Sequence, residues 1–418
     1  MWSAIGAVAG LLLAIVLIIR KFSPVYSLLL GAVVGGLLGG MGLDGTVANM
    51  ISGVKDITPA IIRIIAAGVL SGVLIKTQAA ASISHTIIER LGSRYVFLAL
   101  ALSTMLLTAV GVFIDVAVIT VAPIAIIIAE RMGISKMKLL LAMVGGGKCG
   151  NIMSPNPNTI IAAENFGAPL SSVMLVNVLP AIVGLFIVVY VILPLLPSKN
   201  TASVSDSSLS GVERAGLPSF WASISAPLVV IALLMLRPVV GIAIDPLIAL
   251  PVGGVVGILA TRRWQSTAES ISYGLEKMSV VAVLLVSTGA IAGIVKSSTL
   301  TDYLISWLGQ GESAQMLLAP LSGALMSAAT ASTTAGATIA SASFSQAILG
   351  AGVSAVWGAA LVNVGSTVLD HLPHGSFFHA TGGSMEMGMK ECLRLIPFAT
   401  LVGLVLTLLS LAMYAIVG

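Results

Sequence analysis

Apolar runs long enough to cross a lipid bilayer recur from one end of this sequence to the other, and they constrain its fold more than any other feature. A helix needs about 20 apolar residues to cross roughly 30 Å of hydrocarbon. Only 9% of the 418 residues are charged, whereas about 25% are charged in a soluble domain. Such a chain cannot cover a water-facing surface with polar side chains. The sequence therefore predicts an all-α polytopic membrane protein and excludes a large soluble domain.

Hydropathy divides the chain into two groups of seven apolar segments. Residues 198–218 separate the groups; they are rich in serine, carry charges and lack apolar periodicity, which predicts a cytoplasmic linker. Because a re-entrant hairpin and a pair of spans have the same hydropathy, the pattern predicts 12–14 transmembrane segments. The first group comprises residues 3–19, 24–42, 57–75, 95–112, 116–129, 139–150 and 173–196, and the second comprises residues 219–236, 244–260, 278–295, 313–328, 335–349, 354–369 and 393–416.

The distribution of lysine and arginine predicts how these segments are oriented, because basic residues concentrate in cytoplasmic loops. With the N-terminus outside, all but five of the 20 basic residues fall on the inner side; the exceptions are Lys55, Arg63, Lys148, Arg237 and Lys296. Seven crossings then bring the chain inside, so the second half has the opposite orientation to the first. No basic residue precedes the first apolar segment, which is therefore expected to be a retained span rather than a signal peptide.

The two halves have the same order of segments, which predicts two inverted repeats. Each half has three apolar segments, a short amphipathic stretch, two further segments, and then a segment that leads into a polar break. The break after Gly150 matches the break after Leu369. Inverted repeats are the usual architecture of secondary transporters. The predicted domains are a first repeat over residues 1–197, the cytoplasmic linker, and a second repeat over residues 219–418.

The first polar break is GGGKCGNIMSPNPNT, residues 145–159. Its glycines and prolines disfavour helix, and irregular backbone persists at membrane depth only when it is buried in protein or lines a cavity. The sequence therefore predicts a broken helix or a re-entrant tip, whose freed backbone groups and polar side chains bind a carboxylate and hydroxyl groups. A surface turn between two spans is the alternative. The candidate substrate-binding residues here are Lys148, which would attract an anion, and Asn151, Ser154, Asn156, Asn158 and Thr159.

The second polar break is GSTVLDHLPHGSFFHATGGS, residues 365–384, which holds three of the four histidines. Two matched breaks indicate a binding site between the repeats. Histidine titrates near neutral pH, and the pKa of a buried aspartate can rise toward that range. We therefore expect Asp370, His371 and His374 to take part in proton coupling. A polar loop at the inner membrane surface is the alternative interpretation.

A third polar tract, ATASTTAGATIASAS at residues 329–343, matches residues 111–123 of the first half. Small hydroxylated residues can line a pore, and they can also pack helices closely together. Asp115 is a carboxylate between two apolar segments, and ionisable groups inside a membrane are functional candidates. Asp115 is therefore a further candidate for proton coupling. The alternative interpretation is that it lies in a loop at the level of the lipid headgroups. The substrate-binding candidates in the third tract are Thr330, Ser332, Thr333 and Thr334.

At these motifs the chain resembles the gluconate permease family of proton-coupled organic-acid symporters, within the larger ion-transporter superfamily. The resemblance covers most of the chain, and its most specific part is the Gly-then-Pro-x-Pro pattern of residues 150–157. Family members more often carry a His-Pro-Pro-His-Pro-type sequence where this chain has Ser154 to Asn158. The resemblance implies a homodimer and elevator-type movement. It also implies a scaffold formed by residues 1–75 and 219–295, with a transport part formed by residues 76–197 and 296–418 that contains two re-entrant hairpins.

The sequence and the resemblance together predict a secondary active symporter of the bacterial inner membrane. It would import a small hydroxylated carboxylate, such as gluconate, glycerate or 3-hydroxybutyrate, together with protons by alternating access. A sodium/proton antiporter or a sodium-coupled carboxylate transporter of the same superfamily remains an alternative. We predict no enzymatic activity, because only residues 370–374 come near a catalytic constellation. No GxxxxGK[ST] motif indicates ATP-driven transport; the two isolated cysteines make no metal site, so no cofactor is expected.

Overall fold

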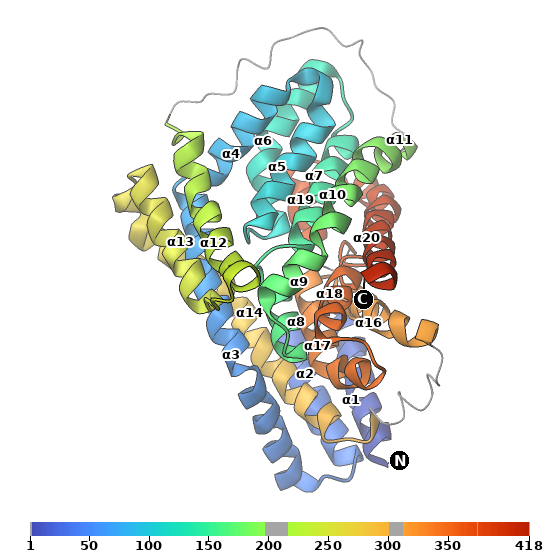
Figure 1. Ribbon diagram of the computed structural model, residues 1–418. Helices are drawn as coiled ribbons and strands as arrows, with labels where there is room; N and C mark the ends of the chain where they lie inside the picture. The colour runs from blue at the N-terminus through green and yellow to red at the C-terminus, as the bar shows by residue number, and fades with distance from the viewer. Residues whose placement is uncertain (1, 197–215, 301–311, 374, 418) are drawn as a thin grey trace.

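The computed structural model describes residues 2–196, 216–300, 312–373 and 375–417, and every regular element in these ranges is a helix (Figure 1). Most of the predicted linker, and residues 301–309 of the second amphipathic stretch, lie outside the described residues. The helices of the first half are α1 (Trp2–Ile19), α2 (Pro24–Leu38), α3 (Gly42–Lys76), α4 (Ala79–Leu91), α5 (Val96–Ala109), α6 (Ile114–Met132), α7 (Lys136–Ile152), α8 (Pro157–Phe166), α9 (Leu170–Val176), α10 (Val178–Ile187) and α11 (Leu193–Leu195). Those of the second half are α12 (Phe220–Val240), α13 (Pro246–Thr261), α14 (Thr267–Lys296), α16 (Glu312–Thr330), α17 (Thr333–Gly350), α18 (Ala355–Gly365), α19 (Ser376–Ser384) and α20 (Met389–Val417).

Within the described part of the chain, six helices are long and apolar enough to cross a membrane. The pair α4 and α5, bent by 108°, makes up to seven. Four shorter apolar helices accompany them, because turns and polar breaks divide several of the predicted segments. The prediction of an all-α polytopic membrane protein is confirmed, while the total of 12–14 crossings stays a prediction.

The two longest single helices, α3 and α14, cross at the centre of one half of the molecule (Figure 1). Glycines make this close crossing possible. A Cβ atom at Gly68 would lie 2.7 Å from the carbonyl oxygen of Gly274, and one at Gly53 would meet the backbone of Gly289 and Gly293. Small residues at such a crossing let two membrane helices pack backbone against backbone. The order of these contacts along the two helices shows that α3 and α14 run antiparallel.

The helices form two groups, and the first group contains this crossing. Helices α1 and α2 pack on each other and on α14, and helices α12 and α13 pack on each other and on α3. Helices α5, α7, α8, α16, α17, α18 and α20 pack mainly among themselves. We call the first set, α1–α3 and α12–α14, the crossing group, and we call the rest the broken-helix group. The two groups meet where α17 packs against α14 and α8 packs against α3.

Candidate functional site

The chain leaves the helical conformation between α7 and α8, as the sequence predicted. Pro157 occupies the first turn of α8, where its missing N–H leaves no hydrogen bond unmade. Asn156 caps that helix: its Oδ1 accepts hydrogen bonds from the backbone N–H of Thr159 at 3.1 Å and from the Thr159 hydroxyl at 2.9 Å. Its Nδ2 donates to the carbonyl and the side-chain oxygen of Asn151. The break is therefore buried and held by its own side chains, and it is not a surface turn.

The second break runs from the end of α18 at Gly365 to the start of α19 at Ser376. One amide just before it, Asn363 of α18, contacts the first break. The Nδ2 atom of Asn158 donates to Oδ1 of Asn363 at 2.6 Å, and Nδ2 of Asn363 donates to the Thr159 hydroxyl at 3.1 Å. All three side chains are buried. The two breaks thus lie against each other, although more than 200 residues separate Asn158 from Asn363 in the chain.

Lys148 and Asp370 form an ion pair between the breaks, with 2.7 Å between Nζ and Oδ1, and neither side chain is exposed. The Lys148 ammonium also donates to the carbonyl oxygens of Thr367 at 2.5 Å and Ala399 at 2.9 Å. The other carboxylate oxygen of Asp370 accepts from the Thr333 hydroxyl at 2.6 Å. In this conformation the ammonium that was expected to attract a substrate anion is neutralised by Asp370, one of the expected proton-coupling groups.

His371 is buried beside this pair, and its ring packs against the aromatic rings of Phe377 and Phe378. Its Nε2 lies 3.0 Å from the Thr381 hydroxyl oxygen. Because that hydroxyl donates to the carbonyl of Phe377 at 2.7 Å, its oxygen is free to accept from an Nε2–H group. His371 Nδ1 then keeps a lone pair, and it has no hydrogen-bond partner among the described residues. His374 lies outside the described residues.

A cavity of about 380 Å³ lies where the N-terminal ends of α6, α17 and α19 come together against α14. The predicted residues Asp115, Asn151, Ser332, Thr333 and Thr334 all line it. Val280, Val281 and Leu284 of α14 provide an apolar wall. Both predicted breaks and the third polar tract therefore contribute to one cavity, although hydropathy gave no information on which residues of each would face it.

The donors around this cavity suit an anion that also carries hydroxyl groups. The first N–H groups of each helix have no partner within the helix, and they place partial positive charge at its N-terminal end. Three such ends converge here. Asn151 adds an amide: its Oδ1 accepts from Asn156, and its buried Nδ2 has no hydrogen-bond partner within the described residues. This donor therefore keeps a hydrogen bond that no described residue accepts.

The other predicted residues that the structure describes do not line the cavity. Ser154, Asn156, Asn158 and Thr159 hold the first break, and Lys148, Asp370 and His371 hold the second. Thr330 donates to the carbonyl of Met326 within its own helix. No group of three histidine, cysteine, aspartate or glutamate residues is placed to hold a metal ion in the part of the chain that the structure describes.

Sequence reasoning missed several residues that the structure places at the site. Glu276 and Lys277 of α14 line the cavity, as do Ser376 and Phe377 at the start of α19. The available signal was the pair of charges at Glu276 and Lys277 just before a long apolar run, where we took Lys277 only as a mark of orientation. Asn363 was also missed, although it is a single amide within an apolar segment.

Apolar helices that are interrupted around a cavity with polar side chains in its lining are typical of membrane transporters. The GntP family permease model matches residues 2–417, and the chain belongs to this family. The predicted resemblance to gluconate permeases is confirmed, and the family identifies the protein as a multi-pass membrane permease rather than an enzyme, also as predicted.

Comparisons with individual proteins agree with this assignment. The chain is 52% identical to an uncharacterized transporter of Haemophilus influenzae, over 99% of this chain and 98% of that protein. It is 30% identical to the high-affinity gluconate transporter of Escherichia coli over 53% of this chain and 50% of that protein. It is 25% identical to the D-serine transporter DsdX of Escherichia coli over 80% of this chain and 81% of that protein.

Solved structures share the fold. The YdaH transporter of Alcanivorax borkumensis matches with a TM-score of 0.63 at 14% identity, covering 88% of this chain and 86% of that one. MtrF of Neisseria gonorrhoeae matches with a TM-score of 0.60 at 13% identity, covering 90% of this chain and 85% of that one. At these identities the likeness concerns the architecture alone.

Proposed function

We propose that this permease imports a small hydroxylated carboxylate together with protons by alternating access across the bacterial inner membrane. The observation that carries the proposal is the cavity at the three helix ends, because its unpartnered Asn151 amide and its backbone donors match a carboxylate. Its Ser332, Thr333 and Thr334 side chains match hydroxyl groups. Gluconate and D-serine, the substrates in the names of two relatives, both carry a carboxylate, with several hydroxyl groups in gluconate and one in D-serine.

The order of helices supports an inverted repeat and an elevator-type movement. In each half, the three helices of the crossing group come first in the chain. They are followed by α5 or α16, then by a helix that starts at the cavity, and then by a broken helix. Helices α6 and α17 both begin at the cavity, and α7–α8 and α18–α19 are both broken. The proposed scaffold is the crossing group, and the proposed transport part is the broken-helix group, with the molecule acting as a homodimer.

The test is uptake by purified protein in liposomes. Labelled gluconate, glycerate, 3-hydroxybutyrate, lactate and citrate would be offered with an imposed pH gradient, with a sodium gradient, or with neither. We expect accumulation of a hydroxylated acid that depends on the pH gradient. Accumulation that depends on the sodium gradient instead would support the alternative of a sodium-coupled carboxylate transporter. Sodium movement against protons, with no acid uptake, would replace the proposal with an antiporter.

Within this proposal, Asp115 carries the coupled proton, because it is the aspartate of the expected coupling groups that lines the cavity. Its carboxylate lies in the first turn of α6 and accepts from the N–H of Val116 at 2.9 Å. An anionic substrate beside a charged Asp115 is repelled, and protonation removes that repulsion, so proton and substrate bind cooperatively.

The Asp115→Asn variant is therefore expected to lose accumulation driven by a pH gradient while it retains exchange of labelled for unlabelled acid. The measurement compares net uptake with exchange in the same liposomes. The Asp56→Asn variant is a matched control, because Asp56 pairs with Lys296 at 2.8 Å away from this cavity. Accumulation at the parent level in Asp115→Asn would assign the proton to another group.

A further inference from the structure

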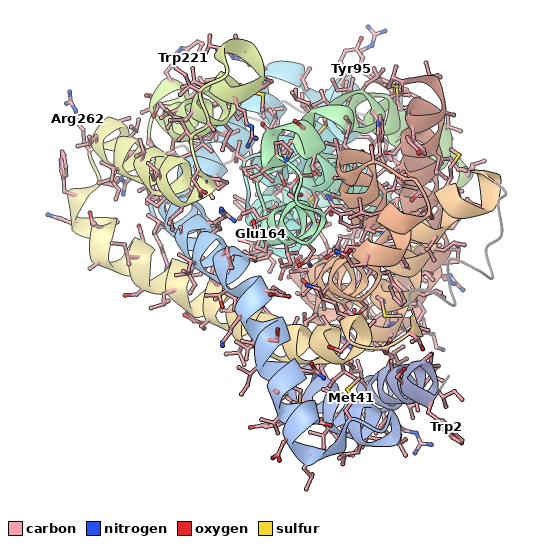
Figure 2. The ribbon with its side chains drawn as sticks, turned by 60° about the horizontal axis from the view of Figure 1, so that its bottom comes forward. Trp2, Met41, Tyr95, Glu164, Trp221 and Arg262 are labelled. Carbon is pink, nitrogen blue, oxygen red and sulfur yellow. The ribbon has the colours of Figure 1, made fainter. Side chains whose placement is uncertain are left out.

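Arg63 lies near the middle of the long helix α3 and holds two carboxylates that come from different parts of the chain. With Asp245, which caps the start of α13, it makes three hydrogen bonds: Nε to Oδ1 at 3.0 Å, Nε to Oδ2 at 3.2 Å, and Nη2 to Oδ2 at 2.8 Å. Its remaining nitrogen, Nη1, donates to Glu164 near the end of α8. In Figure 2, Glu164 lies where α8, in green, comes next to α3, in blue.

The contact with Glu164 joins the two groups of helices, whereas the contact with Asp245 does not. Arg63 and Asp245 belong to the crossing group, and Glu164 follows the first break in the broken-helix group. Two other ion pairs, Lys76 with Glu269 at 2.6 Å and Lys296 with Asp56 at 2.8 Å, connect α3 to α14 inside the crossing group. Any sliding of α8 along α3 must therefore break the Arg63–Glu164 pair and can leave the other pairs intact.

The surroundings allow this pair to open at low cost. Arg63 would keep its hydrogen bonds to Asp245, so no unpaired arginine would remain. Glu164 lines a cavity of about 220 Å³ with Arg63 and a second cavity of about 260 Å³ with Lys296 and Asn165. The Glu164 carboxylate therefore has a cavity on each side, and the second cavity is also lined by the cation Lys296. The side chains of Arg63 and Glu164 are only 25% and 29% exposed, which keeps the closed pair partly shielded from water.

We infer that Arg63 and Glu164 form a latch that stabilises the conformation described here, in which the Asn151 cavity lies against the first half of α14. The latch would thereby favour this conformation over the other state of the transport cycle. The inference rests on the proposed alternating access. It assigns to Arg63 and Glu164 a role in selecting the state of the transporter, and none in contacting the substrate.

The test measures the side from which the cavity is reached. Cys149 and Cys392 are replaced by alanine, and Thr334→Cys places a single thiol in the cavity. An impermeant maleimide is applied to inside-out and to right-side-out vesicles, and the ratio of the two labelling rates is determined. Glu164→Gln removes the charge at nearly constant volume. We expect it to change the inside-to-outside ratio about two- to fivefold, the range typical of a partly exposed ion pair.

The Glu269→Gln variant is the matched control, because it breaks an ion pair within the crossing group and is expected to leave the ratio unchanged. An unchanged ratio in Glu164→Gln, or an equal change in both variants, would overturn the latch. Labelling needs no substrate, so the two proposals can fail separately. A ratio that shifts in a protein that moves none of the acids would keep the latch and overturn the proposed substrate. Acid uptake with an unchanged ratio would keep the proposed substrate and overturn the latch.

Discussion

Replacing Lys148 by methionine is expected to lower the free energy of unfolding by about 3–5 kcal/mol, because Asp370 would keep a buried charge without its partner. The double variant Lys148→Met/Asp370→Leu is expected to recover most of this loss, since apolar residues of similar size often replace a buried ion pair at little cost. The measurement is the unfolding midpoint of each purified protein in detergent.

Transport by the double variant then separates two roles for the pair. If the double variant is stable and still accumulates acid, Lys148 and Asp370 act only by holding the two breaks together. If it is stable and inactive, at least one of the two charges takes part in binding or in proton coupling, as the sequence predicted. Lys76→Met is the control, because it removes a lysine from an exposed pair and is expected to unfold like the parent. A Lys148→Met protein as stable as the parent would show that the buried pair is not ionised.

The largest effect on transport is expected from Asn151→Asp. This change keeps the Oδ1 acceptor that Asn156 uses and replaces the unpartnered Nδ2 donor by an oxygen. A donor bound to a carboxylate would be lost, and a hydrogen bond to a charged group is worth about 1.5–3 kcal/mol, or roughly 10- to 150-fold in affinity. We expect the concentration of acid that gives half-maximal uptake to rise by at least this factor.

Initial rates of uptake over a range of acid concentrations would measure the change. Asn49→Asp is a matched control, because Asn49 lies near the start of α3, makes its side-chain contact with Met41, and is not among the residues that line the cavity. An Asn151→Asp protein with the affinity of the parent would place the substrate elsewhere. Loss of folded protein in this variant would be visible in the same unfolding assay used for Lys148.

The breaks could be predicted from the sequence because their causes are local. Pro157 cannot donate a backbone hydrogen bond, and Asn156 is a favourable cap for the helix that Pro157 begins. These preferences act within a few residues, so they can be recognised without knowing the fold. The same holds for Ser332, which caps α17 by accepting from the N–H of Ala335 at 3.3 Å.

The partners of these residues could not be predicted in the same way. Lys148 was expected to attract a substrate anion, but it lies within reach of Asp370, a residue more than 200 positions away. Whether Lys148 contacts a substrate carboxylate or the carboxylate of Asp370 depends on how the helices pack. The apolar surfaces that decide this packing are alike throughout the chain, so the sequence does not show which helices are neighbours. Lys277 and Glu276 were missed for a related reason: only the crossing of α14 with the broken-helix group brings them to the cavity.

The amide contacts between the two breaks also bear on the order in which the chain can be completed during synthesis. Asn158 pairs with Asn363, and Lys148 pairs with Asp370. Both polar groups of the first half therefore lack their partners until nearly nine-tenths of the chain has been synthesised. Until then the nascent first half presents an unmatched cation and an unmatched amide inside the bilayer. A chain that ended before residue 363 would keep an unpaired charge and an unsatisfied amide in the apolar interior, and both are energetically costly.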